Sequence, residues 1–376
     1  MRAVAGFVAL GIFWGALGAA LPAVQRHAGA DDGQLGLALL LVGLGALISM
    51  RLAGVLIDRL GPRVTPITIG VFGITAILPA LADSPGRLYL FMLAVGAASG
   101  AMDVAINADA VREELRTGRP LLNLVHAGFS GGVVAASLAA GALRWAGVGL
   151  GTIFGLVGVL VLASAIAVRS SAPWERPPSE ARPRFFQRVP SWLLAIGALG
   201  AVAFWIEGAW QDWSAVHLER AFDASPGASA LGPALFAGAM AVGRLAAHGL
   251  ARPGSERAVL VVGGALAGAG SVLAAVASSA PLALAGMAVA GAGCSVCAPT
   301  LVSLAGSAAA PRERATIVGS LTTVMYLGFL VGPAAVGVLA DAASLRASLV
   351  AVGVLGFVLA GLFAVVRFPG VWKTHA

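Results

Sequence analysis

Hydrophobic residues in this chain fall into long runs that are separated by short polar stretches. Each run has about 20 residues or more, which is the length an α-helix needs to cross the hydrocarbon core of a bilayer. The pattern therefore predicts an all-α integral membrane protein with twelve transmembrane helices, at roughly residues 3–25, 35–57, 64–83, 87–110, 121–144, 148–169, 191–213, 228–251, 257–278, 281–305, 314–339 and 344–367.

The least hydrophobic stretch, residues 169–190, lies near the middle of the chain and is rich in arginine and proline. Proline blocks helix continuation and clustered arginines do not enter hydrocarbon, so this stretch is expected to be a loop in water or against headgroups. It predicts an N-terminal six-helix bundle at 1–169, a cytoplasmic linker at 170–190 and a C-terminal six-helix bundle at 191–376.

Composition supports the membrane class, because 59% of the residues are hydrophobic and only 11% are charged. Soluble domains carry about 25% charged residues. The net charge of +7 does not indicate nucleic-acid binding here, because the basic residues lie in short loops between the runs. Cys294 and Cys297 lie inside one run and have no further ligand nearby, so we expect neither a metal nor a cofactor.

The distribution of basic residues predicts the orientation of the helices. With the N-terminus inside, most arginines fall on the cytoplasmic side, as the positive-inside rule requires. Twelve helices then place both termini in the cytoplasm. The opposite side keeps a smaller set of arginines: Arg26, Arg87, Arg144, Arg220 and Arg346.

The two halves repeat around their second helix. The stretch from Arg51 through Arg59 to Gly61 recurs, at constant spacing, from Arg244 through Arg252 to Gly254. Two six-helix units of parallel topology, with a solute site between them, are a transporter architecture. Glycines at helix-face spacing, such as Gly96 with Gly100 and Gly328 with Gly332, predict closely packed helices in each unit.

Four stretches carry a resemblance to a known family: GVLIDRLGPR at 54–63, GAMDVAIN at 100–107, NLVHAGFSG at 123–131 and EGAWQDWSAVHL at 207–218. The first resembles the loop motif between helices 2 and 3 of the major facilitator superfamily. The others resemble its bacterial MosC/YbjJ-like branch, which is distantly similar to fucose:proton symporters and has one member linked to an inositol-like rhizopine. Ala251 replaces the motif's aspartate in the second half.

This resemblance implies the major facilitator fold, with two six-helix bundles related by pseudo-twofold symmetry, in the bacterial cytoplasmic (inner) membrane. It implies a secondary transporter whose cavity is lined by helices 1, 4, 5, 7, 10 and 11, and we expect a monomer. It also implies that Asp58 holds the cytoplasmic side shut through the helix start near Thr316 and through Arg112. Arg59 and Arg63 belong to the same gating motif.

Polar residues inside the runs are the candidate site of the first half. Asp103 and Asn107 are four residues apart and share a helix face. A mid-membrane carboxylate costs about 3 kcal/mol unless it is paired, wetted or protonated, so it marks a functional site or a structural contact with a neighbouring helix. His126 shares a face with Asn123 and Ser130, and it either titrates near neutral pH or hydrogen-bonds across the helix pair.

In the second half, Glu207, Trp210, Gln211 and Ser214 are spaced as one helical stripe and predict a cavity face. Asp212 and His217 are expected at a solvated helix end. Arg51 and Arg244 lie one or two turns from the cytoplasmic ends of their helices. There they either extend toward the headgroups or form gating ion pairs.

The expected cavity combines aromatic walls, Phe13, Trp14 and Tyr326, with carboxylate, amide and hydroxyl groups. This mixture suits a small sugar-like or polyol-like solute, and it leaves proton coupling through Asp103 and Glu207 open. No Gly-rich phosphate loop supports ATP-driven transport, and no nucleophile motif supports an intramembrane hydrolase. We therefore expect no enzyme. A transporter-like sensor or scaffold without turnover remains the alternative.

Overall fold

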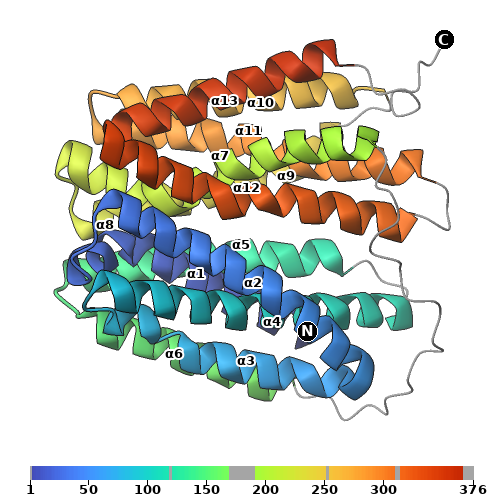
Figure 1. Ribbon diagram of the computed structural model, residues 1–376, viewed down its shortest axis with the longest axis horizontal. Helices are drawn as coiled ribbons and strands as arrows, with labels where there is room; N and C mark the ends of the chain where they lie inside the picture. Colours follow the sequence, from blue (N-terminus) through green and yellow to red (C-terminus); the bar gives the residue numbers. More distant parts are fainter. Residues whose placement is uncertain (1, 118–120, 169–190, 251–253, 310–313, 367–376) are drawn as a thin grey trace. The chain divides into compact units, whose positions relative to one another are not determined.

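The structure is a computed structural model that describes residues 2–117, 121–168, 191–250, 254–309 and 314–366. Every regular element in these ranges is helical (Figure 1). The bounds are α1 Arg2–His27, α2 Asp32–Leu60, η1 Gly61–Arg63, α3 Val64–Thr75, η2 Leu78–Leu81, α4 Pro85–Thr117, α5 Leu122–Trp145, α6 Leu150–Val168, α7 Ser191–Phe222, α8 Pro226–Ser229, α9 Leu231–Leu250, α10 Glu256–Val276, α11 Ala280–Ala308, α12 Arg314–Ala342 and α13 Leu345–Val365.

Within the described ranges, 12 stretches are helical, long and apolar enough to cross a membrane. The predicted spans are therefore confirmed, with local differences at their ends. The third span is not one continuous helix, because α3 ends at Thr75 and the short 3-10 helix η2 completes the stretch to Leu81.

The second helix shows how the sequence fixes a helix at both ends. Asp31 caps α2 by accepting a hydrogen bond of 2.7 Å from the Gln34 amide, and the Gln34 side chain accepts one from the Asp31 amide at 3.1 Å. Gly61 ends α2 with φ of 63°, a backbone conformation that glycine adopts without steric cost. The glycine of the predicted loop motif thus has a local structural role.

The first compact unit comprises residues 1–180 and 213–234. Within it α1 packs mainly against α5, α2 against α4, and α3 against α6 and α4 (Figure 1). The side chains of Phe13, Phe72 and Phe154 meet where α1, α3 and α6 come together, at ring-centroid distances of 4.8 and 6.3 Å from Phe13.

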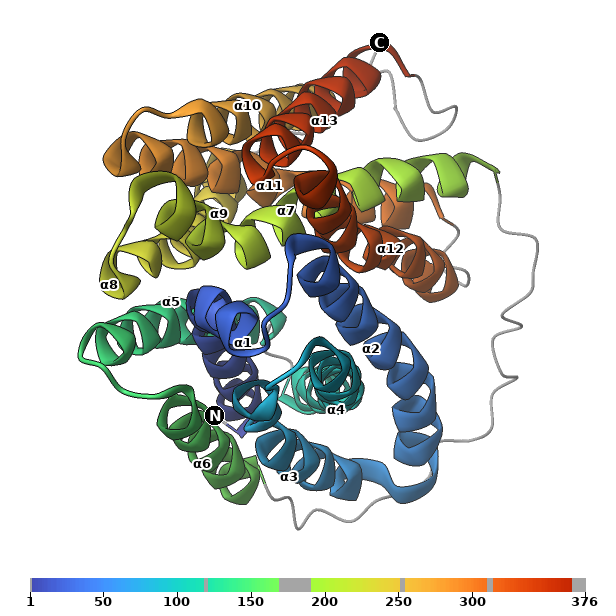
Figure 2. The same ribbon diagram turned by 60° about the vertical axis from the view of Figure 1, so that its left-hand side comes forward.

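The second compact unit comprises residues 181–212 and 235–376. Here α10 packs against both α11 and α13 (Figure 2). Glycine contacts join α7 to α12 and α9 to α11. The pairs α1–α5, α2–α4 and α3–α6 thus have counterparts in α7–α12, α9–α11 and α10–α13, so the repeat seen in the sequence is also a repeat of packing.

The glycines predicted to allow close packing do so. A Cβ on Gly96 of α4 would lie 2.0 Å from the Val42 carbonyl oxygen of α2. A Cβ on Gly328 of α12 would lie 1.9 Å from the Ala201 carbonyl oxygen of α7. Backbone contact of this kind needs a residue without a side chain, and it brings helices together where the hydrophobic effect supplies no driving force.

Helix α7 has 32 residues and is therefore roughly 48 Å long, which exceeds the ~30 Å hydrocarbon core. The boundary between the two compact units falls inside this helix, between Asp212 and Trp213. The predicted linker 170–190 lies outside the described residues, so the division at that linker stays a prediction.

Candidate functional site

The predicted carboxylate of the first half lies in α4 together with its amide neighbour. The Asn107 side-chain amide donates to Asp103 Oδ1 at 3.0 Å and to the Asp103 carbonyl oxygen at 2.9 Å. Both side chains are half-buried. A single amide donor therefore orients one oxygen of this carboxyl group.

The predicted polar face of α5 is only partly described. His126 is exposed, and its ring packs edge-on against Phe7 of α1 at 5.0 Å between centroids. Ser130 is half-buried. The side chain of Asn123 lies outside the described residues.

The predicted carboxylate of the second half repeats the arrangement found in α4. Gln211 donates from its side-chain amide to Glu207 Oε1 at 3.0 Å, again four residues apart on one helix. Arg244 of α9 places Nη2 4.0 Å from the same Glu207 oxygen. The structure therefore joins Glu207, Gln211 and Arg244, which the sequence had assigned to a solute stripe and to a gate.

Trp210 does not lie on an accessible face, contrary to the predicted stripe. Its side chain is fully buried, and its indole Nε1 donates to Ser271 Oγ of α10 at 2.7 Å. Ser214 is also fully buried. The physical reason is tertiary: Ser271 of α10 lies against this side of α7, so the indole is enclosed between the two helices.

The aromatic residues separate into a core group and an accessible group. Phe13, predicted as a cavity wall, is fully buried against Phe72 and is a core residue. Trp14 is half-buried and meets Phe13 edge-on at 5.4 Å. Tyr326 is half-buried and belongs to a second aromatic group around Phe204.

That second group lies between α7 and α12. Phe204 stacks on Phe329 at 4.4 Å and meets Tyr326 edge-on at 5.6 Å. Phe204 precedes Glu207 by three residues, so the two side chains share a face of α7. The predicted aromatic wall at Tyr326 is thus next to the face of the second carboxylate.

The predicted gating residues lie around the turn that follows α2. Asp58, Arg59 and Arg63 are exposed, and Asp58 has no ion pair with any residue that the structure describes. Arg112 instead pairs with Asp109 on its own helix. Arg51 is exposed, and the side chain of Thr316 lies outside the description.

A cluster of charged residues that the sequence analysis did not group lies in the first unit, around Glu219 of α7. Glu219 Oε2 accepts from Arg26 at 2.8 Å, and Oε1 accepts from Arg144 at 2.7 Å and from the Ser229 hydroxyl at 2.9 Å. Arg144 also donates to the Ala19 carbonyl oxygen. Glu219 thereby connects the last turn of α7 with α1, α5 and α8.

Arg220, the next residue of α7, makes a parallel set of bonds. Its guanidinium donates to Asp32 Oδ2 at 2.7 Å and to Gln25 Oε1 at 2.8 Å, and Gln25 in turn donates to Asp32 at 2.9 Å. We call the whole group the Glu219 cluster; it consists of Gln25, Arg26, Asp32, Arg144, Glu219, Arg220 and Ser229.

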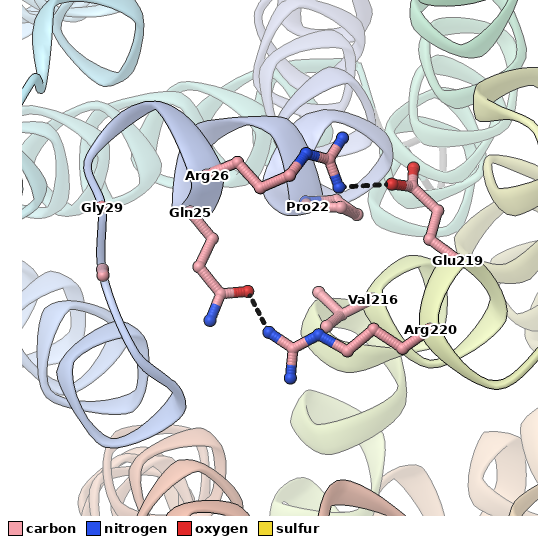
Figure 3. A pocket seen from close by; sticks show the side chains of 8 residues that line it. Pro22, Gln25, Arg26, Gly29, Val216, Glu219 and Arg220 are labelled. Carbon is pink, nitrogen blue, oxygen red and sulfur yellow. Dashed lines mark hydrogen bonds and ion pairs between the residues drawn. The ribbon is translucent and has the colours of Figure 1, made fainter. Parts of the chain in front are cut away.

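A cavity of about 230 Å³ lies within the Glu219 cluster (Figure 3). In Figure 3 the side chains of Arg26 and Gln25 reach from α1 toward Glu219 and Arg220 of α7, with the two bonded contacts drawn. The cavity is lined by Pro22, Gln25, Arg26, Gly29, Ala30, Val216, Glu219 and Arg220.

The end of α7 is more enclosed than predicted. His217 is buried rather than solvated, and its ring meets Phe222 edge-on at 5.7 Å. Asp212 is half-buried. The helix continues to Phe222 and packs inside the first unit, which removes the solvated end expected near residue 213.

One signal in the sequence could have revealed the Glu219 cluster. Arg26, Arg144 and Arg220 belong to the small set of arginines that the charge distribution predicts on the side opposite the cytoplasm, where the positive-inside rule disfavours them. Arginines kept on that side need a local partner, and each of the three is paired with Glu219 or Asp32.

Comparison with known proteins agrees with this architecture. The sequence model of the Major Facilitator Superfamily matches residues 3–258 and again 214–374. An MFS-type transporter of Yersinia pestis is 33% identical over 343 residues, which cover 89% of this chain and 87% of the relative. The membrane protein MosC of Rhizobium meliloti is 28% identical over 360 residues, covering 93% and 86%. The chain therefore belongs to the major facilitator superfamily and is a multi-pass membrane protein.

Solved structures show the same fold at low sequence identity. The nucleoside transporter NupG superimposes with a TM-score of 0.82 at 13% identity and covers 96% of this chain and 98% of its own. The D-xylose-proton symporter gives a TM-score of 0.78 at 12% identity, with 99% and 98% covered. These likenesses show that the chain has the fold of these transporters.

Proposed function

We propose that this protein is a secondary active transporter that moves a small solute across the bacterial cytoplasmic membrane by alternating access, coupled to protons. The observation that carries the proposal is the repeated pair of carboxyl and amide groups. Asp103 accepts from Asn107 in the first unit, and Glu207 accepts from Gln211 in the second, each at 3.0 Å and four residues apart.

The repeat favours proton coupling for a physical reason. An ionisable group inside a membrane protein is expensive unless it faces a wetted cavity, so such groups mark solute or proton pathways. Because the amide donor reaches only one oxygen in each pair, the other oxygen is available to a proton or a solute hydroxyl. Protonation then responds to the wetness and charge of the cavity around it.

A polyhydroxylated solute of the sugar or polyol type fits the accessible side chains. Asn107 and Gln211 are amides, Ser130 offers a hydroxyl, and Trp14 and Tyr326 offer ring faces. Sites of this kind combine aromatic walls with a few polar groups that fix orientation. A nucleoside and D-xylose, the solutes named for the two fold neighbours, also carry several hydroxyls.

The distribution of arginines supports an orientation with both termini in the cytoplasm. In that orientation the turn with Asp58, Arg59 and Arg63 faces the cytoplasm, together with Arg112. The Glu219 cluster faces the opposite side. We propose that Asp58 and the Glu219 cluster are the latches of the two sides, and that the protein works as a monomer.

The experiment that tests the function uses purified protein in liposomes that hold a pH-sensitive dye. Solutes are first selected by their ability to raise the unfolding temperature in detergent, because a ligand that binds only the folded state stabilises it. A selected solute should then accumulate and carry protons inward with it. Binding without accumulation would favour a sensor or scaffold and would contradict the proposal.

A further inference from the structure

Arg244 of α9 has few polar contacts for a guanidinium among the residues that the structure describes. Among the described residues, the one acidic group that it contacts is Glu207, whose Oε1 lies 4.0 Å from Nη2, beyond hydrogen-bond reach. Within the described residues, the guanidinium donates no hydrogen bond, and 40% of the side chain is exposed compared with 10% of Glu207. Five N–H donors are therefore held close to a carboxylate without being used.

Such an arginine is costly in this position. Arg244 lies inside the spanning stretch Pro226–Ala247, three residues before its end, where a guanidinium still needs water, a headgroup or a polar partner to solvate it. Glu207 offsets only part of this cost, because its Oε1 already accepts from Gln211 at 3.0 Å. With 40% of its side chain exposed, Arg244 has donors that water or a ligand must solvate.

The position of Arg244 is set by helix packing. A Cβ on the preceding residue, Gly243, would lie 2.3 Å from Ser295 Oγ of α11, so α9 and α11 touch at this point. This contact fixes the backbone from which the Arg244 side chain extends. Phe204, one turn before Glu207 on α7, contacts the rings of Tyr326 and Phe329 of α12.

From this geometry we infer that Arg244 is an anion-binding group, and that the transported solute is a sugar-like or polyol-like acid with a carboxylate. A guanidinium binds a carboxylate through two parallel N–H···O bonds, which a neutral polyol does not replace. The inference rests on the proposed transport function and adds the charge of the solute to it.

The charges around Glu207 give the proton a role in binding the anion. The titratable groups around Glu207 in the described residues are Arg244 of α9 and the thiols of Cys294 and Cys297 of α11. The empty pair of Arg244 and ionised Glu207 is neutral. A bound carboxylate alone would leave a net negative charge, and protonation of Glu207 restores neutrality. One anion and one proton therefore bind together.

The test measures binding in detergent, which does not require transport. Each acid is compared with its neutral parent: glucuronate with glucose, galacturonate with galactose, and gluconate with glucitol. We expect at least one acid to raise the unfolding temperature of the wild type, more strongly at low pH, whereas its parent does not. Arg244→Gln should weaken that binding at least about tenfold, because it removes charge-assisted hydrogen bonds.

Three further variants keep the result interpretable. Arg244→Lys retains the charge without the two-pronged geometry and should bind the acid with intermediate affinity. Arg87→Gln alters an exposed arginine that pairs with Asp83 and should bind as the wild type does. Glu207→Gln should bind the acid with no dependence on pH.

The inference is overturned if no acid stabilises the wild type, if a neutral parent binds as tightly as its acid, or if Arg244→Gln leaves the affinity for the acid unchanged. These results would leave a transporter of neutral solutes intact. Conversely, acid binding through Arg244 without accumulation in liposomes would retain the inference and contradict the transport function.

Discussion

Arg144 and Glu219 form a buried ion pair, with Nη2 and Oε1 2.7 Å apart and side chains only 5% and 10% exposed. Arg144 comes from the last turn of α5 and Glu219 from the last turns of α7, so residues 75 positions apart are held together. The Ala19 carbonyl oxygen and the Ser229 hydroxyl complete the hydrogen bonding of the two groups. Removal of the Glu219 charge would leave the buried Arg144 without its acidic partner.

This pair predicts a large loss of stability in Glu219→Gln. Breaking a buried ion pair by removing one partner costs about 3–5 kcal/mol, because the remaining charge is uncompensated. Unfolding of the purified protein in detergent should therefore begin at a clearly lower temperature. Asp83→Asn, which breaks the exposed pair with Arg87, should change the free energy of unfolding by less than about 1 kcal/mol. Equal effects of the two variants would show that the Arg144–Glu219 pair is not stabilising.

The same cluster predicts a conformational effect. If the Glu219 cluster closes the side opposite the cytoplasm, Glu219→Gln should populate the state that is open on that side. Val216 is buried and lines the cavity of the cluster, so a Val216→Cys probe should react faster with an impermeant maleimide in that variant. Both labelled proteins also carry Cys294→Ala and Cys297→Ala, so that only the probe thiol reacts.

The control for this labelling is Ala343→Cys, at an exposed position between α12 and α13. Its reactivity should be the same with and without Glu219→Gln. If Val216→Cys is labelled at the same rate with and without Glu219→Gln, the Glu219 cluster is not part of the gate.

The spans, the repeat and the carboxyl–amide pairs could be predicted from the sequence, because hydropathy sets helix length and helical spacing sets which residues share a face. The contacts across helices could not. Periodicity put Trp210 on the stripe of Glu207, yet only the position of Ser271 in α10 determines that Trp210 is buried. The partners of Glu219 lie in α1, α5 and α8, and no local pattern connects them.

The turn after α2 predicts the opposite effect on gating. In Asp58→Asn the cytoplasmic latch loses its charge, so the population should shift toward the state open to the cytoplasm. An anion at a helix N-terminus is favoured by about 0.3–1 kcal/mol, which biases two states without locking either. Thr323→Cys, at an exposed position of α12, should then react faster from the cytoplasmic side in inverted vesicles. Ala251→Asp, at the equivalent position of the repeat, should have little effect, and equal labelling of wild type and Asp58→Asn would contradict a latch at Asp58.

Trp210 is predicted to be structural. Trp210→Phe keeps a six-membered ring but removes the pyrrole ring and the hydrogen bond to Ser271, and it should lower the free energy of unfolding by about 1–3 kcal/mol. Ser271→Ala should have a similar effect, and the double variant should cost less than the sum of the two because the pair is coupled. Solute affinity, measured by the shift in unfolding temperature, should stay at the wild-type value. A large loss of affinity in Trp210→Phe would instead return Trp210 to the solute site.

The proposal of proton-coupled transport is tested most directly by separating net accumulation from exchange in liposomes. Asp103→Asn cannot release a proton, so it should lose uptake driven by a pH gradient while it still exchanges internal for external solute at equal pH. Glu207→Gln should behave in the same way. Accumulation by both variants with the pH dependence of the wild type would contradict proton coupling through the two carboxylates.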